Sequence, residues 1–83
     1  MFTHQQVWEA IEALARGKGW SLSRLAVRAG LDPTALNKSK RNGFDGKPRW
    51  PSTETLCKVL SASETSFNSF AQMIDRLSNR FQP

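Results

Sequence analysis

The sequence predicts an all-α domain, a compact bundle of five short helices. Apolar residues recur at helical spacing along the 83 residues, whereas no stretch of useful length alternates apolar and polar residues as a strand does. Capping residues and glycines interrupt the apolar pattern at short intervals. A chain of this length with one cysteine is expected to form one domain around one core, without disulfides.

The first helix is expected at 4–16. Thr3 and Gln6 have the spacing of a capping box, in which two side chains and two backbone N–H groups pair at a helix start. Gly17 and Gly19 follow, so the helix is expected to end there. One face of this helix is apolar and consists of Val7, Ile11, Leu14 and Ala15.

A second and a third helix are expected to follow closely. The second is predicted at 22–29, because Ser21 can cap a helix that starts there. Asp32 and Pro33 then form a strong start signal, since a carboxylate can cap a helix whose first residue is proline. This signal predicts the third helix at 33–40.

The remaining chain is expected to form a loop and two further helices. Residues 41–51 contain two glycine turn dipeptides and two prolines, which predict a loop. A fourth helix is predicted at 53–61 and a fifth at 65–78, followed by a fraying tail at 79–83. The apolar stripe of the fifth helix has alternating steps of three and four residues and consists of Phe67, Phe70, Ile74, Leu77 and Phe81.

Basic charge is concentrated in one part of the chain. The protein has 12 Lys and Arg against 7 Asp and Glu, a formal net charge of +5. A net +4 falls within twelve positions, whose basic residues are Lys38, Lys40, Arg41, Lys47 and Arg49, opposed by Asp45. Such a patch favours nucleic acid as a partner, because neutralised phosphates release their counterions. The alternative is a solvated loop that maintains solubility.

Several other classes of protein are not expected. No apolar run approaches the roughly 20 residues of a membrane span, and no secretory signal is recognisable, so a cytoplasmic protein without a membrane partner is predicted. One histidine and one cysteine cannot form a closed zinc site, and we expect neither metal nor cofactor. An enzyme is not expected, because His4 lies at a chain end and the acids show no paired spacing.

The second and third predicted helices are expected to cross sharply, because only about three residues join them. A sharp crossing requires a small residue where the helices touch, which Ala26 provides. It also requires a residue that tolerates a positive φ at the end of the first helix, which Gly30 provides. Leu36 would then pack inward and leave the polar face of the third helix exposed.

The spacing of these three residues resembles the helix-turn-helix of lambda-repressor-like (Cro/cI-type, XRE) DNA-binding domains, closest to the N-terminal domain of phage-type repressors. The resemblance covers roughly residues 4–77. It implies that 1–83 is one helix-turn-helix DNA-binding domain of a transcriptional regulator, a phage- or prophage-type repressor. The helix at 33–40 would lie in the major groove of double-stranded DNA. Such repressors can carry a C-terminal regulatory domain, which this chain would lack.

The resemblance also implies particular contacts. Base-facing positions are occupied by Pro33, Thr34, Asn37 and Lys38. Asparagine can pair with adenine, lysine can donate to guanine and a threonine methyl can touch thymine, whereas proline offers only apolar contact. The residues implied as DNA backbone contacts are Ser21, Ser23 and Arg24, with Lys40, Arg41, Lys47 and Arg49 as further candidates. Ser39 stands where the family usually has an apolar residue, which favours an early end of the third helix.

The apolar stripe of the fifth helix extends beyond what a core of this size needs. Its 3-4 spacing is typical of a helix-pairing seam, and the family often dimerises through its C-terminal helix. We therefore expect a homodimer, weak in isolation, that forms through Met73, Leu77 and Phe81 and binds a palindromic operator. The alternative function is a protein-interaction module, such as the antitoxin of a toxin–antitoxin pair, with an apolar patch around Leu77 and Phe81.

Overall fold

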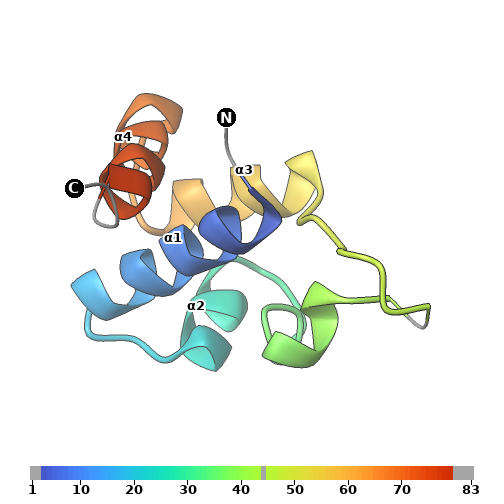
Figure 1. Ribbon diagram of the computed structural model, residues 1–83. Helices are drawn as coiled ribbons and strands as arrows, with labels where there is room; N and C mark the ends of the chain where they lie inside the picture. Colours follow the sequence, from blue (N-terminus) through green and yellow to red (C-terminus); the bar gives the residue numbers. More distant parts are fainter. Residues whose placement is uncertain (1–2, 44, 80–83) are drawn as a thin grey trace.

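Stretches with helical apolar spacing and capping residues form the helices of this protein. The computed structural model describes residues 3–43 and 45–79. In these ranges it contains no strand, and no helix is both long and apolar enough to cross a bilayer. The elements in chain order are α1 (His4–Gly17), α2 (Leu22–Arg28), the 3-10 helix η1 (Lys38–Arg41), α3 (Thr53–Ala62) and α4 (Phe67–Asn79) (Figure 1). The predicted all-α class is confirmed.

The four α-helices begin and end within two residues of the predicted bounds, and the N-terminal caps of α1, α2 and α3 form as the sequence indicates. Thr3 and Gln6 make the complete capping box of α1. The hydroxyl of Ser21 accepts from the backbone N–H of Arg24 at 3.1 Å and caps α2. Ser52 caps α3 in the same way. The tail predicted to fray lies outside the described residues apart from Asn79, the last residue of α4.

The third predicted helix does not form, so the prediction of five helices is wrong. Residues 33–36 form a turn, and η1 follows in place of an α-helix. Backbone hydrogen bonds here close tight turns, from Asn37 N–H to Thr34 C=O at 3.1 Å and from Lys40 N–H to Asn37 C=O at 2.9 Å. Asn37 between them has an extended conformation, with φ −62° and ψ 152°. A short segment rich in polar residues that bond the nearby backbone rarely propagates an α-helix.

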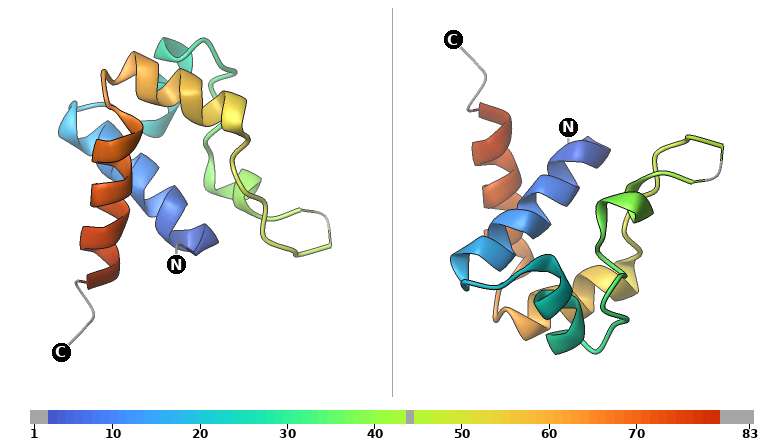
Figure 2. Two further views of the ribbon diagram at one scale, coloured as in Figure 1. Left: turned by 90° about the horizontal axis from the view of Figure 1, so that it is seen from above. Right: turned by 90° about the horizontal axis from the view of Figure 1, so that it is seen from below.

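The helices pack around one core, in which α1 contacts α4 and α2, and α2 contacts α3 (Figure 2). The larger core side chains are Val7, Trp8, Ile11, Leu14, Leu25, Leu36, Val59, Leu60, Phe70 and Ile74. Ala26 is completely buried, as expected for the small residue at the crossing. Gly30 has a φ of +76°, which turns the chain out of α2. The packing expected of residues 22–36 is therefore present, although a turn replaces the third predicted helix.

Gly30→Ala is expected to lower the free energy of unfolding by about 1 kcal/mol, since a left-handed conformation costs a residue with a Cβ roughly 1–2 kcal/mol. The cost is conformational, because an added Cβ would meet nothing within 4 Å. Urea unfolding measures the change. The matched control is Gly17→Ala, which also has open space but no positive φ and ends α1. It should stabilise slightly, and equal destabilisation of both variants would contradict the prediction.

Candidate nucleic-acid interface

The exposed turn after α2 is built around one carboxylate. Asp32 Oδ1 accepts from the backbone N–H of Thr34 at 2.9 Å and from its hydroxyl at 2.7 Å. These hydrogen bonds hold the pKa of Asp32 below its usual value, and the one from the backbone N–H contributes most. The hydroxyl hydrogen of Thr34 is therefore used inside the turn. Its methyl group and the two hydroxyl lone pairs remain for an external contact.

The four residues implied as base contacts are all exposed on this turn and its continuation: Pro33, Thr34, Asn37 and Lys38. Asn37 precedes η1, and its side chain makes no capping hydrogen bond there. Leu36 lies between them with no exposed surface, so it fixes the inner side of the turn. The residues that the sequence places outward are thus exposed, although the backbone that presents them is not helical.

The start of α2 presents a second group of exposed polar residues, Ser21, Ser23 and Arg24. Ser21 accepts the capping hydrogen bond, but its own hydroxyl hydrogen is still available for donation. Arg28, one turn after Arg24, stacks on Trp20 with its guanidinium 4.6 Å from the ring centroid. The first turn of α2 therefore keeps donors that can reach an external anion.

The loop between η1 and α3 contains two short segments, 41–43 and 47–49, that pair in an antiparallel arrangement. Asn42 and Pro48 form an isolated bridge. The N–H of Arg49 donates to the carbonyl of Arg41 at 2.8 Å, and the N–H of Gly43 donates to the carbonyl of Lys47 at 2.9 Å. The arms 41–43 and 47–49 extend away from the helices (Figures 1 and 2). The turn dipeptides predicted a loop, and the structure adds this regular pairing at its base.

Side chains from α1 fix the base of the loop. The ring nitrogen Nε2 of His4 lies 2.6 Å from the carbonyl oxygen of Arg41 and 3.0 Å from that of Arg49. The indole N–H of Trp8 donates to the same Arg49 carbonyl at 3.0 Å. One turn further along α1, Glu12 forms an ion pair with the Arg41 guanidinium. α1 therefore holds this loop through the backbone carbonyls of Arg41 and Arg49 and through the Arg41 side chain.

These α1 residues were not identified as site residues from the sequence. The available signal was their spacing, because His4, Trp8 and Glu12 are each four residues apart and lie along one side of a helix. Sequence position alone suggests that His4 stands at a free chain end. In the structure it joins α1 to two carbonyls, 37 and 45 residues further along the chain.

The structure separates the five basic residues of the patch into two groups. The Arg41 side chain is only 15% exposed, paired with Glu12, and its guanidinium lies 5.4 Å from the ring centroid of Trp8. The Arg41 guanidinium is therefore bound within the protein, to Glu12 and against Trp8. Lys47 lies 3.9 Å from Asp45 in an exposed pair. Among the described residues, Lys38, Lys40 and Arg49 are exposed and have no ion pair within 4 Å.

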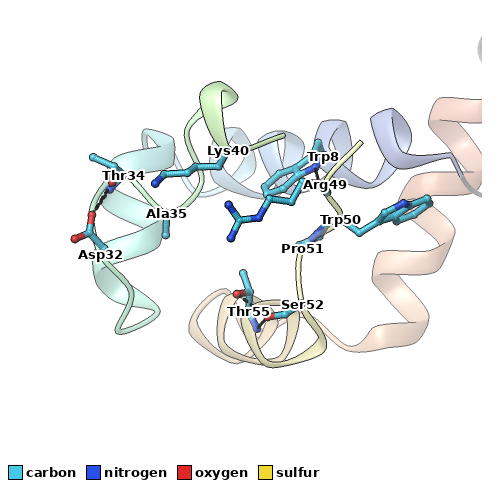
Figure 3. Close-up of a pocket in the computed structure, with 10 residues that line it drawn as sticks. All are labelled: Trp8, Asp32, Thr34, Ala35, Lys40, Arg49, Trp50, Pro51, Ser52 and Thr55. Atoms are coloured by element: carbon cyan, nitrogen blue, oxygen red, sulfur yellow. Dashed lines mark hydrogen bonds between the residues drawn. The ribbon is translucent and has the colours of Figure 1, made fainter. Parts of the chain in front are cut away.

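Two of these unpaired cations project into one pocket of about 510 Å³. The side chains of Lys40 and Arg49 extend into the space between the turn at 32–35 and the segment 49–51 (Figure 3). The pocket is lined by Trp8, Asp32, Thr34, Ala35, Lys40, Arg49, Trp50, Pro51, Ser52 and Thr55. It is therefore continuous with the polar turn through Thr34.

The residues predicted for a dimer interface are partly packed in the monomer. Met73 and Leu77 are half-buried against the core, and together with Ala13 and Arg76 they line a shallow depression between α1 and α4. Phe81 lies outside the described residues. Of the apolar stripe, Phe70, Ile74 and Leu77 are thus packed in the monomer, whereas Phe67 is 55% exposed.

Comparison with protein-family models, curated proteins and solved structures finds no match for this chain. The site is therefore characterised by its own geometry. In the part of the chain that the structure describes, no group of three potential metal ligands occurs. What the surface does contain is a polar turn held from behind by Leu36 and three exposed cations with no carboxylate within 4 Å, Lys38, Lys40 and Arg49. This arrangement is complementary to a polyanion.

Proposed function

We propose that the protein is a sequence-specific double-stranded DNA-binding transcriptional regulator, a phage- or prophage-type repressor that acts as a dimer on a palindromic operator. The observation that carries the proposal is the exposed turn from Pro33 to Lys38, backed by the buried Leu36 and flanked by the exposed cations Lys40 and Arg49. The resemblance of the sequence to lambda-repressor-like domains supports the same function.

The element that would enter the major groove is the turn with η1 in place of a recognition helix. Asn37 and Lys38 lie in its middle, and their exposed side chains carry the donors and acceptors that distinguish base pairs. The groove is about 12 Å wide and admits elements other than helices. Thr34 would contribute its methyl group, because its hydroxyl hydrogen is donated to Asp32.

The DNA backbone would be held by exposed groups on both sides of the turn: Ser21, Ser23, Arg24, Lys40, Lys47 and Arg49. The proposal leaves out Arg41, because its guanidinium is paired with Glu12 and largely covered. The dimer would form along α4 through Met73 and Leu77, at the depression beside α1.

Binding of operator-like palindromes selected from a random library tests the proposal, with fluorescence anisotropy at several salt concentrations. Asn37→Ala should weaken the best sequence by about 1–3 kcal/mol and reduce discrimination at one base pair. Arg49→Ala should weaken all sequences and reduce the salt slope by about 1.

The matched control is Lys58→Ala, which also removes one positive charge but from a lysine that pairs with Glu54 on α3 at 3.1 Å. It should leave discrimination unchanged. Equal affinity for all sequences, unaffected by Asn37→Ala, would contradict specific recognition. Stable association with another protein, with no DNA affinity at about 0.1 M salt, would favour the protein-interaction alternative.

A further inference from the structure

Asp32 uses one carboxylate oxygen to close the turn after α2 and leaves the other exposed. Both hydrogen bonds from Thr34 end on Oδ1, which lies 2.9 Å from the backbone nitrogen and 2.7 Å from the hydroxyl oxygen. Oδ2 has no hydrogen-bond partner among the described residues. Figure 3 shows this second oxygen directed away from the pocket that Lys40 and Arg49 enter. Two donors on Oδ1 restrict the rotation of the carboxylate, so Oδ2 is held in a defined direction.

The exposed oxygen is a charged acceptor. The bonds from Thr34, that from the backbone N–H most of all, hold the pKa of Asp32 below its usual value, so the group is ionised at neutral pH. An ionised carboxylate accepts hydrogen bonds and donates none. Lys40 also acts on Asp32 electrostatically, but it forms no ion pair with it within 4 Å. Oδ2 therefore remains available to an external donor.

A carboxylate at this position is unfavourable for DNA binding unless it meets a donor. Asp32 directly precedes Pro33 and Thr34, two of the exposed residues that the proposed function places at the bases. The DNA phosphates would repel its charge, whereas an asparagine or a serine could close the same turn without that repulsion. The charge of Asp32 is favourable only where Oδ2 reaches a hydrogen-bond donor of the DNA.

The major groove offers such donors on two bases, the N4 amino group of cytosine and the N6 amino group of adenine. Adenine also presents its N7 acceptor beside the amino group, and two acceptors repel each other. Cytosine presents the amino group without an acceptor of its own. An ionised carboxylate is therefore complementary to cytosine.

We infer that Asp32 is a specificity-determining residue whose Oδ2 accepts a hydrogen bond from the N4 amino group of a cytosine in each half-site of the operator. Thr34 is its positioning residue, because both of its donors hold Oδ1. The inference rests on the proposed function and deepens it, since it adds a base contact and names the base. It also gives the charge of Asp32 a role that closing the turn does not require.

The first experiment selects bound duplexes from a random library with the full wild-type chain and with Asp32→Asn. Asparagine keeps an oxygen for both bonds from Thr34 but places an NH₂ group where Oδ2 stands. The wild type should prefer cytosine at one position of each half-site about tenfold over other bases. Asp32→Asn should lose this preference in favour of a base with a major-groove acceptor, guanine or thymine.

The second experiment changes the DNA and leaves the protein intact. N4-methylcytosine still pairs with guanine, but its methyl group replaces the amino hydrogen that faces the major groove. At the selected position it should weaken binding by the wild type about tenfold, and it should change the affinity of Asp32→Asn much less. The wild-type measurement decides the inference even if Asp32→Asn does not fold.

The matched control is Asp45→Asn. Asp45 is also exposed, and its Oδ1 accepts from the backbone N–H of Lys47 at 3.0 Å, so the variant removes the same charge from a similar turn. It should leave the base preference of the protein and its sensitivity to N4-methylcytosine unchanged.

The outcomes separate this inference from the proposed function. If Asp32→Asn binds every sequence more tightly with the same base preference, the carboxylate only closes the turn and the inference alone is overturned. Equal wild-type affinity for the unmodified and the N4-methylcytosine operator overturns it too. A preference for adenine that Asp32→Asn loses would overturn the assignment to cytosine. Absence of DNA binding by the wild type overturns the proposed function and this contact with it.

Discussion

Leu36→Ala is expected to lower the free energy of unfolding by about 2–5 kcal/mol, the cost of removing a large buried aliphatic side chain. Leu36 has no exposed surface and belongs to the same core as Leu25 and Ala26. Stability of a domain is only about 5–15 kcal/mol. A large fraction of the total therefore depends on one side chain in a segment without α-helical hydrogen bonds.

The effect should be largest locally, because Leu36 holds residues 33–40 to the core and the next attachment to α1 is at Arg41. The same segment is otherwise exposed, apart from the half-buried Ala35 and Arg41. Urea unfolding measures the global loss, and hydrogen exchange at 33–41 measures the local one. The matched control is Val27→Ala on α2, because Val27 is an aliphatic residue that is 56% exposed. It should change stability by less than about 0.5 kcal/mol, and a similar loss in both variants would contradict the assignment of Leu36 as the anchor.

The sequence predicts the α-helices well because their signals are local. A capping residue and an apolar face occur in each of α1, α2 and α3, glycines follow α1 and α2, and all these signals act over a few residues. The segment at 33–40 has a helix start signal but lacks a full apolar face and a stop residue. Asp32 followed by Pro33 can begin a helix or an Asx turn, and a single large apolar residue, Leu36, does not decide between them.

The candidate site is less accessible to sequence reasoning because its determining contacts are non-local. Counting charge identifies a basic patch but does not show that Arg41 is paired with a glutamate 29 residues earlier. The exposed residues of the turn follow from the position of Leu36, whereas the pocket around Arg49 depends on how α1 holds the loop. Spacing along α1 indicates a shared face without indicating what that face contacts.

Glu12→Gln is expected to lower the free energy of unfolding by about 2 kcal/mol. Its carboxylate pairs with Arg41, whose side chain is 15% exposed, and a cation that loses its partner keeps the cost of its desolvation. The Nε atom of Arg41 already lacks a hydrogen-bond partner in the described structure, so little other compensation is available. Urea unfolding measures the loss, which should persist at high salt because a largely covered pair is weakly screened.

A double-mutant cycle with Arg41→Met separates the pair from its surroundings. Methionine keeps an apolar stem over Trp8 but removes the charge, so the double variant should recover more than half of the loss seen in Glu12→Gln. Additive losses would show that the two side chains act independently. Arg16, 3.9 Å from Glu12 and exposed, provides the control: Arg16→Met should cost less than about 0.5 kcal/mol.

The same variants decide whether Arg41 serves the loop or contacts DNA, as the sequence pattern predicts. If Arg41 binds a phosphate, Arg41→Met should reduce the salt slope of DNA binding by about 1. If Arg41 only anchors the loop, the slope should stay near the wild-type value. Affinity would then fall because Arg49 loses its fixed position. Glu12→Gln also distinguishes the two roles, because the expected changes in DNA affinity have opposite signs. If Arg41 contacts DNA, its release from Glu12 should strengthen binding. If Arg41 only anchors the loop, loosening the loop should weaken binding.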